Sequence, residues 1–311
     1  MRVRLGDMRA RSAVSHQFHR IRRTLDFYWR EGALTNYVPR GHFYSPLPDC
    51  SEGAKIASKI FERPVDLNFP GLDLRVDAQK DLLFKIIDLY PDFSWSEQPL
   101  PGRRFHFNQD WYKQADSICL YSVLRIFRPR SVIEVGSGYS SALMLDVDER
   151  YLGGQTAFTF IEPESERLDA LLSEEDKQRV QIIRQPVQNC SVEIFSNLKS
   201  GDILFIDSSH VAKVGSDVNY LMSEIIPRVP VGMLIHFHDV FWPFEYPPGW
   251  VQGGIAWNEA YLLRAFLMFN SSFEIVLWVP FCAKRWPNLV RERMPGYMSN
   301  TGAAIWVRRV R

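Results

Sequence analysis

The sequence predicts an α/β fold in which a doubly wound, mostly parallel sheet is covered by helices on both faces. Short apolar runs alternate with helix-like stretches from residue 131 onward, and a glycine-containing turn follows the first run directly. Alternating strands and helices form βαβ units, which give parallel sheets. The last two runs show no helical pattern between them, so we expect an antiparallel strand at the C-terminal edge of the sheet.

Seven apolar runs are predicted as strands because each is short and bounded by turn residues. They cover residues 131–135, 158–162, 180–184, 202–207, 232–239, 273–279 and 302–310. Helical periodicity predicts helices near 77–90, 111–127, 214–226 and 257–269. For the second helix, Asn108 or Asp110 is the expected cap and Pro129 the expected end.

Three segments are predicted along the chain: a basic arm (1–30), an irregular and helical N-terminal extension (31–105), and the sheet-containing domain (106–311). The arm holds eight arginines and two acids, a net charge of +6. Two interpretations of the arm stay open: a solvated tail, or a weak contact with a membrane surface or another anionic partner. Prolines and glycines scattered through 31–105 explain why that segment is predicted to be mostly irregular.

Composition excludes several classes of protein. The 311 residues carry a net charge of only +1, which argues against a specific nucleic-acid partner. No apolar run approaches the roughly 18 residues that a transmembrane helix needs. The four cysteines lie far apart and form no C-x-x-C pair, so neither a disulfide framework nor a zinc site is expected. These features together predict a cytoplasmic protein with reduced thiols.

The strongest motif is SVIEVGSGYSS at residues 131–141, where a predicted strand leads into Gly136-Ser137-Gly138 and then a helix. Glycines let the backbone approach a ligand closely, and the free N–H groups of a helix start favour an anionic group. A dinucleotide fingerprint would place a third glycine at 141, where Ser141 stands, and would not place an acid at Glu134. A carboxylate at 134 suits a ligand that carries an ammonium or sulfonium.

This E-x-G-x-G-x-S pattern resembles motif I of the class I S-adenosylmethionine-dependent methyltransferases, which have a Rossmann-like fold. The resemblance implies that S-adenosylmethionine is the cofactor. It also implies that Glu162, at the end of the second strand, accepts hydrogen bonds from the ribose hydroxyls, and that residues after the third strand contact adenine. The cofactor-binding residues expected on this basis are Glu134, Gly136, Ser137, Gly138, Ser140, Ser141, Glu162, Gln185 and Asp207, with Val187 and Gln188 as further adenine candidates.

A second group of polar residues follows the fourth and fifth strands in DILFIDSSH and LIHFHDVF. Asp207 and His210 come from the first of these segments, and His238 and Asp239 from the second. Neighbouring parallel strands bring these ends together, where the side chains could deprotonate a hydroxyl or hold a divalent cation. We therefore predict His210, His238 and Asp239 as catalytic residues.

The D-x-x-H and H-D patterns resemble those of macrolide sugar O-methyltransferases and cephalosporin-hydroxylase-like proteins. The related cation-dependent O-methyltransferases bind Mg²⁺ at these two strand ends, which implies Asp207, Asp239 and His238 as ligands of Mg²⁺ or another divalent cation. Val240 stands where the catechol-type enzymes carry asparagine, a departure from their metal site. A metal-free mechanism, with a histidine as base and a carboxylate fixing its tautomer, stays open at this point.

Other residues are expected at the margins of the site. An aromatic loop at 241–257 could wall a substrate pocket, with Glu245, Asn258 and Glu259 beside it. Trp111, Tyr112 and Lys113 could edge the cofactor. His236 shares a face with His238 but lies deeper, so a hydrogen-bonded core histidine is expected there.

The predicted function is S-adenosylmethionine-dependent methyl transfer, to an oxygen of a small molecule or sugar. Two alternatives stay open: a nicotinamide-dependent oxidoreductase, and a non-catalytic protein that binds S-adenosylmethionine or a partner. The chain has neither a [DN]-P-P-[YF] tetrad after the fourth strand nor a phosphate-binding P-loop.

Overall fold

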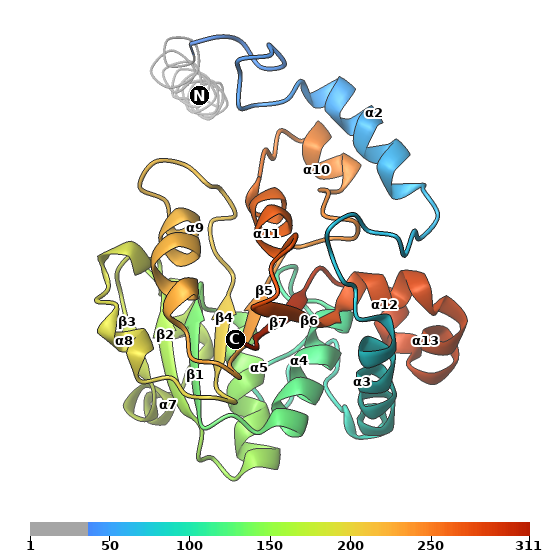
Figure 1. Ribbon diagram of the computed structural model, residues 1–311. Coiled ribbons are helices and arrows are strands. Elements are labelled where there is room, and N and C mark those ends of the chain that lie inside the picture. The colour runs from blue at the N-terminus through green and yellow to red at the C-terminus, as the bar shows by residue number, and fades with distance from the viewer. Residues whose placement is uncertain (1–36) are drawn as a thin grey trace, which may run out of the picture.

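A computed structural model describes residues 37–311, and the basic arm predicted at 1–30 lies outside the described residues (Figure 1). A seven-stranded sheet has the order β3-β2-β1-β4-β5-β7-β6. Strand order reverses between β1 and β4, as in doubly wound sheets, and ligands of such sheets bind beside that point. The strands are β1 (Ser131–Val135), β2 (Ala157–Ile161), β3 (Gln181–Ile183), β4 (Ile203–Ile206), β5 (Leu234–Phe237), β6 (Phe273–Trp278) and β7 (Ile305–Arg309).

The first five strands run parallel, which confirms the expected α/β class. Strand β7 pairs antiparallel with both β5 and β6, so the C-terminal strand lies one position inside the edge that β6 forms. Two helices connect β6 to β7, where none was expected. Prolines at the starts of both helices are compatible with the first helical turn, where no backbone N–H is needed.

Helices cover both faces of the sheet in Figure 1. Alternate residues of each strand point to opposite faces: Val132 packs in one core and Ile133 in the other, as do Phe205 and Leu204 on β4. The helices are α2 (Cys50–Phe61), α3 (Val76–Leu89), α4 (Gln114–Phe127), α5 (Tyr139–Val147), α6 (Glu166–Leu171), α7 (Glu174–Arg179), α8 (Glu193–Ser196), α9 (Asp217–Tyr220), α10 (Pro248–Gln252), α11 (Glu259–Leu267), α12 (Val279–Arg285) and α13 (Pro287–Arg293). Within residues 37–311, no helix is both long and apolar enough to cross a membrane.

The N-terminal extension contains two helices. α3 was expected and packs into the same core as α4 and α12. Its buried Gln79 accepts a hydrogen bond from the Trp278 backbone N–H at 2.7 Å, which ties α3 to the end of β6. α2 was not expected, and it lies beside α10 at the top of Figure 1.

Helix α4 begins later than the sequence suggested. Gln114 is its first residue, and neither Asn108 nor Asp110 caps it. The Gln109 side chain instead accepts hydrogen bonds from the backbone N–H groups of Trp111 and Tyr112, which holds this stretch in a turn before the helix. The helix ends at Phe127, with Arg128 in the left-handed region ahead of Pro129.

Candidate active site

The glycine loop lies at the carboxyl end of β1, where strand order reverses. Gly136 has φ +81°, and a Cβ at this position would lie 1.8 Å from the carbonyl oxygen of Asp207. Any side chain would therefore collide with the neighbouring β4 loop, and glycine is required. A methyl group added at Gly138 would have the flexible Arg167 side chain as its nearest neighbour, at 3.3 Å, so the space there is less restricted.

Glu134 lies beneath the glycine loop and is fully buried. Ser140 Oγ donates to its carboxylate at 2.5 Å, Ser141 Oγ donates to the other oxygen, and Ser141 Oγ also accepts from the Gly138 N–H. Burial raises the pKa of Glu134 from its ordinary 4.5 to about 8, although the two serines oppose this effect. The Glu134 side chain therefore holds the glycine loop in place through the two serines. It was expected to face the cofactor, but it does not line the cavity.

Glu162 follows β2 and faces the loop. Its two carboxylate oxygens accept the backbone N–H groups of Ser137 at 2.9 Å and Glu164 at 2.8 Å. Each oxygen has a second lone pair, so the carboxylate keeps capacity to accept hydrogen bonds from a ligand. Its position on the cavity wall fits the predicted role toward ribose hydroxyls.

Two neighbouring cavities lie above the carboxyl ends of β1 and β4. They measure about 270 and 520 Å³, and both are lined by Gly136, Glu162 and Asp207. Val187 and Gln188 line the larger cavity, whereas Gln185 lies off its wall with its amide on Asn189 and Cys190. The pair of cavities therefore offers an elongated site, with Val187 and Gln188 better placed than Gln185 to meet an adenine ring.

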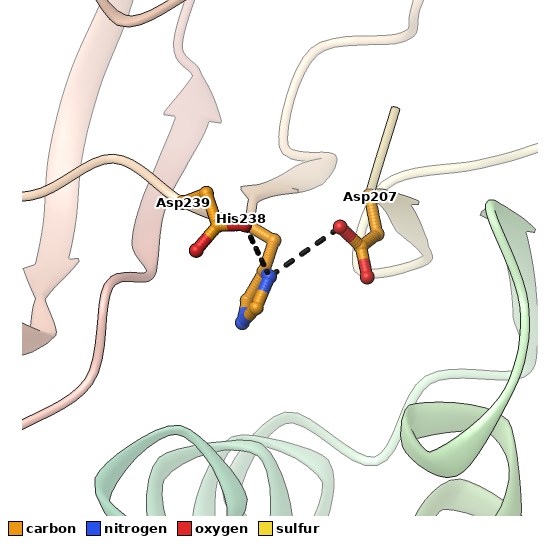
Figure 2. A group of neighbouring side chains, drawn as sticks. All are labelled: Asp207, His238 and Asp239. Atoms are coloured by element: carbon orange, nitrogen blue, oxygen red, sulfur yellow. Dashed lines mark ion pairs between the residues drawn. The ribbon is translucent and has the colours of Figure 1, made fainter. Parts of the chain in front are cut away.

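Asp207, His238 and Asp239 converge on the smaller cavity (Figure 2). Their ligand atoms all lie within 4.8 Å of one another. Figure 2 shows the His238 ring between the two aspartates, with Nδ1 at 3.4 Å from Asp207 Oδ1 and 3.6 Å from Asp239 Oδ2. Two carboxylates and one imidazole at this spacing form a donor set that suits a divalent cation.

His210 joins this group from the loop after β4. Its Nε2 lies 3.3 Å from Asp207 Oδ1 and 3.5 Å from Asp239 Oδ2, and its Nδ1 lies 2.8 Å from Glu259 Oε2. Glu259 begins α11 and also accepts a hydrogen bond from Ser208 Oγ at 2.9 Å. His210 and Asp239 both have positive φ, +59° and +54°, a backbone conformation that costs free energy in non-glycine residues and occurs often at functional sites.

The charges in this cluster are strongly coupled. Burial alone would raise the pKa of Asp207, but His238 and His210 hold it below its usual range. Burial alone would lower the pKa values of both histidines, yet the carboxylates dominate: Asp207 and Glu259 raise that of His210 to about 10, and Asp239 and Asp207 raise that of His238 well above normal. In the absence of a cation, both imidazoles are therefore held in the protonated form.

The sequence offers little indication of three further residues at the site. Asp116 on α4 lies 3.6 Å from His238 Nε2, and Arg167 on α6 lies 3.7 Å over the Trp111 ring at the cavity rim. Neither position belongs to a motif, so only the fold reveals them. Glu259 was expected at the margin but not as the partner of His210.

His236 is a core residue, as expected, but its predicted hydrogen bonds are missing. Its ring stacks on Phe205 with centroids 3.7 Å apart, and neither ring nitrogen has a hydrogen-bond partner among residues 37–311. Burial lowers the pKa of His236 well below normal, so the ring is neutral and packs as an apolar group.

Comparison with known proteins gives a family match over the candidate site. Residues 133–240, which span the glycine loop and both strand-end motifs, match the sequence family described as "Methyltransferase domain". This part of the chain, which carries all the strand-end residues described above, is therefore similar to a methyltransferase domain. The match favours methyl transfer over the nicotinamide-dependent oxidoreductase that the sequence had left open.

Individual relatives are distant. An uncharacterized protein of Archaeoglobus fulgidus is 29% identical over 171 residues, which cover 53% of this chain and 75% of that protein. A Podospora anserina methyltransferase solved with S-adenosylhomocysteine is 14% identical, with a TM-score of 0.43 over 89% of this chain and 100% of that one. The O-methyltransferase TomG from Streptomyces achromogenes, solved with S-adenosylmethionine, is also 14% identical, with a TM-score of 0.42 over 74% and 90% of the two chains.

Proposed function

We propose that this methyltransferase acts on an oxygen of a small molecule or sugar, and that Asp207, His238 and Asp239 hold a divalent cation beside the cofactor. The observation that carries the proposal is the convergence of these three side chains within 4.8 Å, on the wall of a cavity that also contains the glycine loop. The two carboxylates need positive charge beside them, and a divalent cation could supply it in place of the protonated imidazoles.

The donor set fits such an ion. Asp207 and Asp239 offer carboxylate oxygens, and His238 Nδ1 faces both of them. A divalent cation bound there would supply positive charge that lowers the pKa of an acceptor hydroxyl. The hydrophobic Val240 follows Asp239 and is fully buried, so it contributes no ligand and the chain must hold the ion without the asparagine of catechol-type enzymes.

His210 is the proposed general base. Glu259 fixes its Nδ1 and leaves Nε2 directed at the cavity, next to Asp207 and Asp239. If these aspartates held a cation, its charge would offset the carboxylate charges that keep His210 protonated, and Nε2 would then be the atom that takes the proton of the acceptor hydroxyl. The acceptor oxygen then forms its bond to the methyl carbon as the sulfonium–methyl bond breaks, and the proton stays on His210.

The test is methyl transfer from labelled S-adenosylmethionine to a panel of hydroxylated acceptors, with mass spectrometry to locate the label. We expect an O-methyl product, and a fall of about 100-fold or more in turnover for His210→Gln. The exposed Asp88→Asn on α3 is the matched control and should keep full activity. Label on nitrogen or carbon, or a His210→Gln variant as active as the control, would overturn the proposal.

A further inference from the structure

A cavity of about 420 Å³ lies between α2 and α10 and meets the catalytic cavity at a single side chain. Trp257 lines both cavities. The ring centroids of Trp257 and His210 lie 4.4 Å apart. The ring centroids of Trp257 and of Trp250, a residue of α10, lie 5.1 Å apart. Trp257 therefore lies at the junction between His210 and this second cavity, which we call the α2–α10 pocket.

The α2–α10 pocket is mostly apolar. Its only charged lining residue among those the structure describes is Glu245, whose carboxylate already accepts hydrogen bonds from the Tyr261 hydroxyl and the Tyr246 N–H. Apolar pockets with few free polar groups bind apolar ligands or parts of ligands. The apolar walls come from both the N-terminal extension and the aromatic loop: Pro46, Pro48, Ile56, Val251, Ile255 and Ala256.

The segment that carries Trp257 is hydrogen-bonded to the loop after β4, which contains His210. Asn258, next to Trp257, accepts a hydrogen bond from the Ala212 N–H at 2.6 Å and donates to the Ala212 carbonyl. Its own N–H and that of Glu259 both donate to the His210 carbonyl. A group that enters the α2–α10 pocket therefore contacts the segment that positions the base.

We propose that the α2–α10 pocket holds the apolar body of the acceptor while the reacting hydroxyl reaches past Trp257 to His210. The acceptor class is then a hydroxylated compound with an aromatic or aliphatic body larger than one sugar ring. This inference rests on the proposed O-methyl transfer. It also gives the N-terminal extension a direct part in acceptor selection, because α2 supplies one wall of the pocket.

The test uses N-phenyl-1-naphthylamine, an uncharged aromatic probe whose fluorescence rises in apolar surroundings, titrated into the full chain saturated with S-adenosylhomocysteine. We expect one saturable site. Ile56 lines the pocket yet is 50% exposed, so Ile56→Lys should fold normally and weaken probe binding at least tenfold, while Ile56→Leu should preserve it. Phe84→Lys is the matched control, because Phe84 is a similarly exposed apolar residue of α3 away from the pocket.

Displacement by two hydroxylated compounds tests whether the pocket takes the apolar arm of such a molecule. Caffeic acid phenethyl ester carries an apolar arm and should displace the probe, whereas caffeic acid, with the same catechol group, should not. Equal probe binding by wild type, Ile56→Lys and Phe84→Lys, or failure of the ester to displace the probe, would overturn the inference. Affinity for S-adenosylhomocysteine is measured in the same samples; its absence would count against the cofactor assignment instead.

Discussion

Gly136 is the residue on which the cofactor loop depends most directly. Replacing it with alanine would place a methyl group against the Asp207 carbonyl and would force a positive φ on a residue with a side chain. We expect Gly136→Ala to lose S-adenosylhomocysteine binding by at least tenfold in calorimetry. Gly138→Ala should lose less, because Arg167 can move. Equal affinities for the two variants would show that the loop tolerates a side chain at 136.

Glu134 gives a pH dependence of stability that can be worked out in sign. Folding raises its pKa from 4.5 to about 8. The protonated side chain therefore favours the folded state, and the free energy of unfolding of the wild type falls as the pH rises from 4.5 to about 8. Glu134→Gln cannot ionise. The Tm of the variant relative to wild type should therefore rise between pH 5 and pH 9, as measured by calorimetry.

The matched control for this effect is Glu164→Gln, because Glu164 is exposed. Its Tm difference from wild type should be the same at both pH values. A Glu134→Gln difference that is flat, or that falls with pH, would mean that Glu134 is ionised in the folded protein.

Glu259 should act on catalysis through His210. Glu259→Gln keeps a hydrogen-bonding group beside Nδ1 but removes the negative charge that stabilises the imidazolium, so turnover should fall between about 10-fold and 100-fold. Affinity for S-adenosylhomocysteine should stay within twofold, because Glu259 does not line either cofactor cavity. Loss of cofactor affinity would instead assign Glu259 a structural role. Initial rates and calorimetry on the same samples separate the two outcomes.

At the residue scale, the sequence indicated which motif residues lie close together but not which other residues contact them. Asp207, His238 and Asp239 could be expected to converge because they end neighbouring strands. Asp116 could not, because it comes from a helix that precedes the sheet and lies 91 positions from Asp207 in the chain. Glu134 was placed on the correct turn, but the direction of its side chain depends on two serine hydroxyls that pattern alone does not orient.

At the scale of elements, the strands were predictable because buried runs bounded by turn residues leave few alternatives. The starts of helices were less predictable. Helix α4 begins at Gln114 because the Gln109 side chain holds the preceding residues in a turn, so the expected caps are not used. α2 was not predicted from the sequence, and its buried residues are the two small side chains of Ala54 and Ala57. α12 and α13 were missed because each is only seven residues long, too short for a clear helical period.

Arg104 joins the N-terminal extension to the sheet domain. Its guanidinium contacts Asp146, Glu149 and Asp176, and the first and last of these are almost fully buried. Removing one partner of a buried ion pair leaves an uncompensated charge. Arg104→Ala should therefore lower the free energy of unfolding by about 3 kcal/mol, measured by denaturant unfolding.

The control is Lys55→Ala, which breaks an exposed pair with Glu52 on α2. Exposed pairs contribute about 0–1 kcal/mol, so this variant should be close to wild type. A comparable loss in the two variants would mean that the Arg104 network is no stronger than a surface pair.

At the scale of the whole molecule, the α/β class followed from the alternation of strands and helices in the sequence. The position of β7 between β5 and β6 did not, because sequence order does not specify which strands pair. The proposed boundary at 105/106 stays a prediction: α3 shares a core with α4, so the extension packs closely on the domain that follows it. The interpretations of the basic arm at 1–30 also stay open, because it lies outside the described residues.

The central claim is that Asp207, His238 and Asp239 hold a divalent cation needed for turnover. The most direct measurement is Mn²⁺ titration of chelator-treated protein, followed by electron paramagnetic resonance, with methyl transfer assayed in the same samples. We predict one Mn²⁺ per chain, its loss in Asp239→Asn, and turnover that stops in chelator and returns with Mn²⁺ or Mg²⁺ in the wild type alone. Full turnover in chelator, with no Mn²⁺ bound, would contradict the claim and leave the metal-free histidine mechanism.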